Sequence, residues 1–461
     1  MTNSNRRDFL RWNLALAASL APGLGIVNAM RPVHAASISG GYKALVCVYL
    51  AGGNDSFNMF VPYGGSAHSA YATARQDLAI PTADLIPVDP VSGGTIRHGF
   101  HENMPAMADL FDQGSLAVAA NVGTLIRPIT KSQYESNASS VPAHLFSHND
   151  QSDRWMAADA SNRYGQGWAG RMMDMLYDNA AVPRPSPSIS IGGNNLWQSG
   201  RDVRLFEMSA GGVSSAHLPW HEGPFKLQDA YEQVSAAGKR NDSLFVAEHA
   251  LRQERAIEFS RYVNAALEGA PDFEGVFGGD PLSAQLRMVA RLIAVRDLLD
   301  PDRTVNRQVY FVQIGGWDTH AEQNGDTESN HPNLLGVLSG ALGAFQSALD
   351  SVDMRDQVTT FTATEFGRSL TPNGSGTDHG WGGHSLVMGG AVSGNAVYGT
   401  LPELAIDSDD TVENNRIIPS TSVDQYGATL ARWFGMNESE LNNLFPNLGN
   451  FQDRDMGFML S

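Results

Sequence analysis

Three groups of acidic and histidine residues follow short apolar runs in the sequence, and each group could bind a metal ion. Asp55 comes shortly after the run 43–50, and Asp318 and His320 come after the run 308–314. The third group follows the run 358–364 and contains Glu365, Asp378, His379 and His384. Because carboxylate oxygens and imidazole nitrogens are usual ligands of zinc, manganese and similar ions, the pattern predicts a divalent metal site.

A site of this kind would be suited to ester hydrolysis. Two divalent ions about 4 Å apart can activate a nucleophile and stabilise the leaving oxygen of a phosphate or sulfate ester. Single groups also have a structural explanation, since Asp55 could belong to a simple turn and Asp318 could cap a helix. The third group is the hardest to explain in this way, because Asp378, His379 and His384 lie within seven residues.

A candidate nucleophile, Ser147, lies at the expected start of a helix, with His148 beside it. Backbone N–H groups at a helix N-terminus can receive an oxyanion, and a serine in this position can attack an ester. Arg154, further along the same segment, could contact an anionic substrate. The alternative is that Ser147 only caps the helix.

The elements that must position these residues alternate between strands and helices. Strands are expected at 43–50, 116–120, 188–191, 308–314, 358–364 and 385–388, and helices at 103–113, 242–268, 281–299, 334–349 and 423–434. Continuous apolar runs are typical of strands that are buried on both faces of a parallel sheet. We therefore predict an α/β fold with a doubly wound, mostly parallel sheet, helices on both faces and loop insertions. Ligand sites in such sheets form outside the carboxyl ends of the strands, where the three groups would meet.

The first 35 residues are predicted to be a twin-arginine signal peptide. Arg6 and Arg7 precede a weakly apolar run at 14–27, and Val33-His34-Ala35 offers a cleavage pattern of small residues. The run is too short and too often interrupted to remain in a bilayer as an anchor. The expected location is the periplasm or the cell exterior, with the twin-arginine translocase as a partner during export.

Residues 36–461 are predicted to form one domain, in which the Gly-, Ser- and Pro-rich segment 194–239 is an inserted cap or excursion. The formal net charge is −18, and without the first 35 residues it is 27 − 48 = −21. This charge disfavours nucleic acid and anionic lipid as partners. Cys47 is the single cysteine, so no internal disulfide can form.

Taken together, the motifs resemble those of a large uncharacterised family of exported bacterial proteins related to the alkaline phosphatase/sulfatase superfamily. Besides the twin-arginine start, they are Gly-Gly-Asn-Asp-Ser-Phe-Asn at 52–58, Gly-Gly-Trp-Asp-Thr-His at 315–320, Thr-Glu-Phe-Gly-Arg at 364–368 and Asp-His-Gly-Trp-Gly-Gly-His at 378–384. The resemblance covers nearly the whole chain after the signal peptide. It implies an alkaline phosphatase-like α/β core with a two-metal site above the sheet.

The resemblance also implies roles for single residues. Asp55 matches an aspartate that binds one metal after the first strand of that superfamily. Asp318 with His320 resembles a later Asp/His pair, although the spacing is shorter here. Glu365 or Asp378 would be the acidic ligand after the late strand.

His379 and His384 are similar to the histidines that complete such a site, and Ser147 would be the nucleophile. The resemblance thus implies zinc or manganese as cofactor, with up to two ions. A formylglycine sulfatase is disfavoured, because the motif Cys or Ser, then x-Pro-x-Arg, is absent from the sequence.

The leading hypothesis is an exported metal-dependent hydrolase of phosphate or sulfate esters, on a small molecule or a polymer. The alternative is a non-catalytic member of the same fold that binds an envelope or polysaccharide partner. An exported oxidoreductase is the third class, and it is disfavoured because no Gly-x-Gly-x-x-Gly motif follows a strand.

Overall fold

The computed structural model describes residues 41–92, 96–136, 139–159, 165–177, 186–213, 227–240, 243–300, 304–327 and 330–460. The predicted signal peptide, residues 1–35, lies outside the described residues. All described residues belong to one compact unit. None of the helices in the described ranges is long and apolar enough to cross a membrane.

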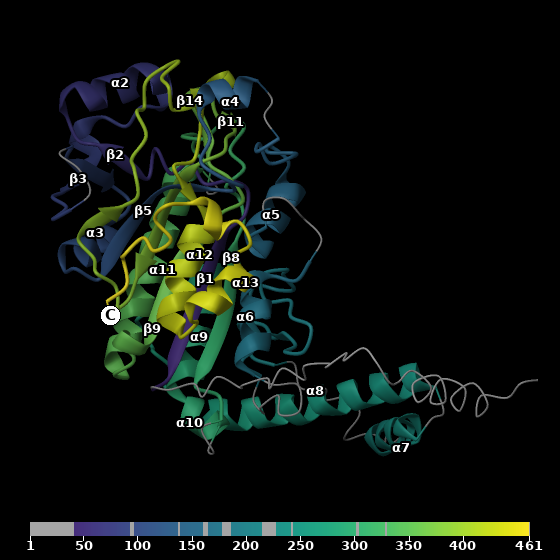
Figure 1. Cartoon of the computed structure of the whole chain (residues 1–461). Helices are drawn as coiled ribbons and strands as arrows, with labels where there is room; N and C mark the ends of the chain where they lie inside the picture. The colour runs from purple at the N-terminus through teal and green to yellow at the C-terminus, as the bar shows by residue number, and fades with distance from the viewer. Residues whose placement is uncertain are drawn as a thin grey trace, which may run out of the picture. The chain divides into compact units, whose positions relative to one another are not determined.

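A nine-stranded sheet forms the centre of this unit (Figure 1), in the order β13-β5-β12-β9-β1-β8-β6-β7, with β16 paired to β5. Its strands are β1 (Lys43–Leu50), β5 (Leu116–Gly123), β6 (Ser188–Ser190), β7 (Phe206–Glu207), β8 (Arg307–Ile314), β9 (Val358–Ala363), β12 (Gly383–Met388), β13 (Ala396–Tyr398) and β16 (Thr421–Ser422). β1 is parallel to β8 and β9, whereas β12 is antiparallel to β5 and β9. The predicted α/β class with a mostly parallel sheet is confirmed.

Helices cover both faces of the sheet, because the side chains of its strands alternate between two apolar cores. On β1, Val46 and Val48 belong to one core, while Leu45 and Cys47 belong to the other. The first core receives α3 (Pro105–Asp112), α9 (Pro281–Ala294) and α11 (His331–Ser351). The second receives α5 (His148–Ala157), α6 (Trp168–Leu176), α12 (Val423–Phe434) and α13 (Glu438–Leu444).

Further elements surround the sheet. They are α2 (Gly65–Arg75), α4 (Lys131–Glu135), α7 (Leu227–Lys239), α8 (Leu244–Glu268), α10 (Arg296–Leu299), the sheet of β2 (Phe60–Pro62), β3 (Leu85–Val88) and β4 (His98–His101), the pair β10 (Arg368–Pro372) and β11 (Thr377–His379), and the pair β14 (Thr411–Val412) and β15 (Arg416–Ile417). The expected helix 281–299 is interrupted at Val295, where ψ changes to 14° and α9 ends. Of segment 194–239, β7 adds an edge strand to the main sheet and α7 packs against α8.

Asp424, in the first turn of α12, carries a carboxyl group inside the second core. Burial raises the pKa of Asp424 to about 8, and its Oδ1 accepts a hydrogen bond from the Asn447 N–H at 3.1 Å. The unfolded chain releases this proton near pH 4, so the stability that this group contributes is present below that pH and is lost as pH rises towards about 8. The loss is at most about 1.4 kcal/mol per pH unit.

Asp424→Asn keeps an oxygen for Asn447 but cannot ionise. We expect the variant to gain stability over the native protein as pH rises from 5 to 8.5, measured by urea unfolding at several pH values. Parallel curves for the two proteins would show that the pKa of Asp424 is not raised in the folded protein.

Candidate metal centre

The carboxyl ends of β1, β8 and β9 meet at one edge of the sheet, because β1 lies between the other two and is parallel to both. The turn after β1 bonds directly to the end of β9, where the Gly52 N–H donates to Glu365 Oε1 at 2.8 Å. Gly52 has a φ of +125°, and a Cβ at this position would lie 2.4 Å from the Asp318 nitrogen. The close approach of this turn to the loop after β8 therefore requires glycine.

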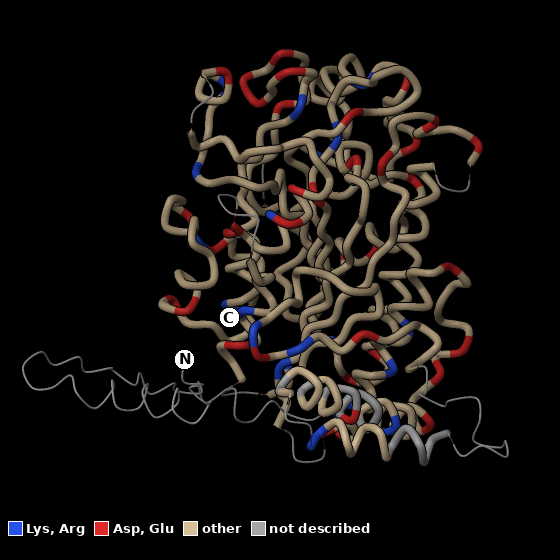
Figure 2. Tube along the Cα trace, turned by 90° about the vertical axis from the view of Figure 1, so that its right-hand side faces the viewer, with Lys and Arg blue, Asp and Glu red and all other residues tan. Residues whose placement is uncertain are grey.

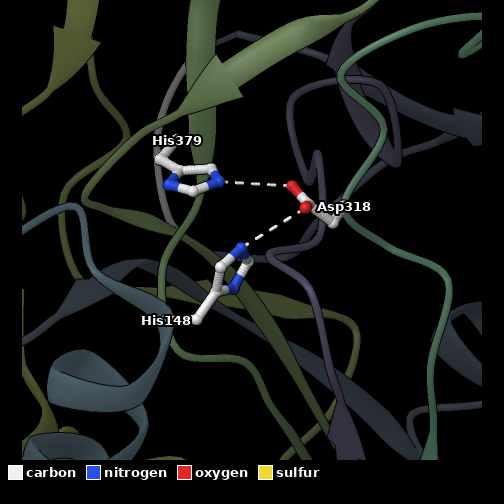
Figure 3. A group of neighbouring side chains, drawn as sticks. All are labelled: His148, Asp318 and His379. Atoms are coloured by element: carbon white, nitrogen blue, oxygen red, sulfur yellow. Dashed lines mark hydrogen bonds and ion pairs between the residues drawn. The ribbon is translucent and has the colours of Figure 1, made fainter.

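Asp318, His148 and His379 form a cluster at this edge (Figure 3), in which one ligand atom from each lies within 4.8 Å of the others. His148 Nε2 is 3.4 Å from Asp318 Oδ2, and His379 Nε2 is 3.3 Å from Asp318 Oδ1. Ligand atoms around a tetrahedral zinc ion, with bonds of about 2.0–2.1 Å, are separated by about 3.3 Å. The distances from Asp318 to the two histidines are therefore close to those between ligands of one ion.

The other ring nitrogen of each histidine is held by an acceptor. His148 Nδ1 is 2.7 Å from Glu365 Oε1, and His379 Nδ1 is 2.7 Å from the Phe146 carbonyl oxygen. An imidazole that donates from Nδ1 presents an unprotonated Nε2, which is the atom that faces Asp318 here. Metal-binding histidines usually donate their second nitrogen to a carboxylate or a carbonyl in this way.

His320 and Asp378 lie on the exposed side of the cluster. His320 Nε2 is 2.9 Å from His379 Nε2 and 3.2 Å from Asp318 Oδ1. His320 Nδ1 lies 3.4 Å from Asp378 Oδ1, and this oxygen also accepts a hydrogen bond from Asn373 Nδ2 at 2.7 Å. His320 thus adjoins His379 and Asp318 but does not belong to the cluster of three.

The surroundings of the cluster favour the metal-binding forms of Asp318 and His379, but not that of His148. Burial acts to raise the pKa of Asp318, but the hydrogen bond and charge of Arg368, with His320 and His148, lower it overall. Burial lowers the pKa of His379, so this ring is neutral at neutral pH. The hydrogen bond to Glu365 raises the pKa of His148, and an ion must compete with a proton there.

Acidic residues are also spread along the trace outside the site (Figure 2), consistent with the formal net charge of −18.

Two of the expected ligands are placed elsewhere. Asp55 is fully buried, forms an ion pair with Arg75 and accepts a hydrogen bond from Gln323 Nε2 at 2.6 Å. His384 packs edge-on against Phe57, with ring centroids 5.3 Å apart, and burial lowers its pKa to about 3. Neither residue belongs to the cluster of three.

Ser147 is the N-cap of α5, which puts His148 at the first helical position and directs it to the cluster. Ser147 Oγ donates to Asp150 Oδ2 at 2.6 Å and accepts from the Asp150 N–H at 3.5 Å. Arg154 is buried in α5, with 5% of its surface exposed. The sequence had suggested a catalytic role for His148, and the structure places it beside Asp318 and Glu365.

Sequence reasoning missed Arg368 and the Phe146 carbonyl. Arg368 is part of the Thr-Glu-Phe-Gly-Arg motif, but the direction of its side chain depends on the pairing of β10 with β11, which no sequence pattern indicates. A main-chain carbonyl such as that of Phe146 cannot be recognised from residue types, because every residue has one.

Known proteins resemble this chain in two ways, by sequence family and by structure. It is similar to the C-terminal periplasmic domain of EcEptC from Escherichia coli in complex with Zn, with 10% identity, 77% of this chain and 74% of that chain covered, and a TM-score of 0.33. It is similar to the soluble domain of lipooligosaccharide phosphoethanolamine transferase A from Neisseria meningitidis, with 8% identity, 92% and 95% coverage and a TM-score of 0.35. It is also similar to the PsFucS1 sulfatase from Pseudoalteromonas sp., with 10% identity, 91% of this chain and 74% of that chain covered, and a TM-score of 0.32. Similarity at these levels says nothing about activity.

No curated protein matches the chain. The sequence matches one family, described as "Protein of unknown function (DUF1501)", over residues 42–441. Because the match covers well over half of the sequence, this chain belongs to that family.

Proposed function

We propose that this protein is an exported metal-dependent hydrolase of phosphate or sulfate esters, with His148, Asp318 and His379 as metal ligands. The observation that carries the proposal is the arrangement of the two imidazoles. Each has its Nδ1 held, by Glu365 or by the Phe146 carbonyl, and each directs its Nε2 at the Asp318 carboxylate. A divalent ion, zinc or manganese, would polarise the ester oxygen and lower the pKa of a water molecule there.

The residues around the cluster supply the remaining roles. Glu365 is 4% exposed and fixes His148 through Nδ1, so the ring cannot turn away from the ion. Ser147 is the proposed nucleophile, because it directly precedes His148 at the N-terminus of α5. Its hydroxyl already donates to Asp150 Oδ2 at 2.6 Å, which places Asp150 to take the proton when Ser147 Oγ attacks the phosphorus or sulfur atom and the ester's alcohol oxygen leaves.

A pocket of about 470 Å³ has Phe146 in its lining and supports a substrate with an organic group. It is lined by Tyr134, Ser139 and residues 141–146, and so includes Phe146, whose carbonyl holds His379. Polar and apolar groups share its lining, which suits an alcohol or sugar portion of an ester. The proposed substrate is therefore an ester on a small molecule or a polymer, met in the periplasm or outside the cell after twin-arginine export.

Metal binding and turnover of the mature protein test this proposal together. We expect the metal-free protein to bind zinc or manganese in calorimetric titration and then to hydrolyse aryl phosphates or aryl sulfates. His148→Ala should lose both properties, because one of the three ligands is gone. His249→Ala, an exposed histidine on α8, is the matched control and should retain them.

Equal metal binding by the His148 and His249 variants would refute the ligand assignment. Metal binding without turnover, unchanged in Ser147→Ala, would instead favour the non-catalytic alternative.

A further inference from the structure

Arg368, the first residue of β10, is the buried cation nearest to the three ligands in the described part of the chain. Its side chain is 0% exposed, whereas the Asp318 side chain that it contacts is 42% exposed. One terminal nitrogen donates to Asp318 Oδ1 at 2.8 Å and to the Gly52 carbonyl oxygen at 3.2 Å. Nε donates to Thr377 Oγ1 at 3.2 Å, and the second terminal nitrogen donates to the Thr377 carbonyl oxygen. The planar guanidinium thus bonds to three separate chain segments at once.

Each of these segments leads to one of the proposed ligands. Asp318 is contacted directly. The guanidinium bonds to Thr377, two residues before His379, and the backbones of Arg368 and His379 pair across β10 and β11. The route to His148 runs through Gly52, whose N–H donates to the Glu365 oxygen that holds the His148 ring.

The geometry points to Arg368 as the positioning residue of the metal centre. Its guanidinium fixes the Asp318 carboxylate. It also links three segments, which are the turn after β1, the loop after β8, and strand β11 itself, so that the ligand atoms lie close together before an ion binds. Arginine suits this role because its planar guanidinium offers five N–H donors in a fixed arrangement. A lysine ammonium cannot bond to the same acceptors at once. This inference rests on the proposed function, since it concerns the same metal site.

A positive charge and a positioning role predict opposite effects on metal affinity. If Arg368 acted only through its charge, removing it would relieve repulsion of a divalent cation and tighten binding. If Arg368 holds the ligands in place, removing it loosens the site and weakens binding. Partners that orient metal ligands typically contribute about 10- to 100-fold to metal affinity.

Zinc titration of Arg368→Met and Arg368→Lys, in competition with a chromophoric chelator, separates the two roles. We expect Arg368→Met to bind zinc about 10- to 100-fold more weakly than the native protein. Arg368→Lys should be weakened nearly as much, because it keeps the charge but not the fork. Unchanged or tighter binding by Arg368→Met, or full recovery by Arg368→Lys, would overturn the inference. Arg432→Met, which removes an arginine paired with Glu438 on α12 and α13, controls for arginine loss in general.

A second variant covers the case in which the Arg368 variants fail to fold. Thr377→Val removes one acceptor of the guanidinium while Arg368 stays, and Gln323 Oε1 keeps its bond from Thr319 Oγ1 at 3.0 Å. We expect a smaller loss of zinc affinity, together with an altered visible spectrum of the cobalt-substituted protein. A native affinity and spectrum in Thr377→Val would contradict the positioning role. Failure of the native protein itself to bind metal would refute the proposed function instead, so the two failures are distinguishable.

Discussion

Replacing Arg75 with methionine is expected to lower the free energy of unfolding by about 3–5 kcal/mol. Arg75 and Asp55 form an ion pair in which both side chains are 0% exposed. The guanidinium also donates to Asn58 Oδ1 at 3.0 Å and to the carbonyl oxygens of Ser369 and Leu370 at 3.1 Å. Without it, the Asp55 carboxylate would remain buried with no countercharge, and this unpaired charge is the source of the large effect.

Urea unfolding measures this effect, and the chain supplies a matched control. Arg97 and Asp89 form an ion pair at 2.6 Å, but their side chains are 44% and 74% exposed. Arg97→Met should therefore change stability by less than about 1 kcal/mol. Adding Asp55→Asn to Arg75→Met should restore part of the loss, because the buried charge disappears. Similar losses for the Arg75 and Arg97 variants would show that burial does not determine the strength of the inner pair.

Asp318→Asn is expected to weaken zinc binding by more than about 100-fold. Asp318 is the only anionic member of the cluster, and its two oxygens face His379 and His148 separately. Asparagine has nearly the same shape, so the variant removes the charge and one oxygen without opening a cavity. Loss of a direct ligand should exceed the 10- to 100-fold effect that is typical of groups behind the ligands.

Competition with a chromophoric chelator measures this affinity, and Asp378→Asn is the matched comparison. Asp378 is also partly exposed, at 38%, but its oxygen contacts His320 and Asn373 rather than the cluster of three. We expect the zinc affinity of this variant to fall by less than about 10-fold, which is below the usual range for residues that hydrogen-bond to metal ligands. If Asp378→Asn lost as much affinity as Asp318→Asn, the ion would bind nearer to His320 than to His148.

The sequence was sufficient to predict a mostly parallel α/β sheet with Asp318 and Glu365 at the ends of its strands. Apolar runs identify β1, β8 and β9 as buried parallel strands, and this places Asp318 and Glu365 at the same edge. The antiparallel direction of β12 could not be read in this way, because a six-residue buried strand has the same composition in either direction.

Individual side chains were harder to assign, because a residue type does not reveal its partner. Asp55 has the sequence surroundings of a ligand, yet it pairs with Arg75 from the end of α2. His384 follows a glycine-rich motif, but its place on β12 turns the ring towards Phe57. His148 joins the cluster through the direction of α5, which depends on how that helix packs on the second core.

Gln323 connects the fully buried Asp55–Arg75 ion pair with the edge of the sheet. It donates to Asp55 Oδ2 at 2.6 Å and accepts from Thr377 Oγ1 at 2.8 Å, and Thr377 in turn accepts from Arg368. An unbroken chain of polar contacts thus runs from the interior to Asp318. The loops of the proposed metal centre are consequently set by the folding of the domain rather than by the arrival of an ion. The metal-free and metal-bound forms should therefore share one backbone conformation, and metal binding should require no rearrangement of these loops.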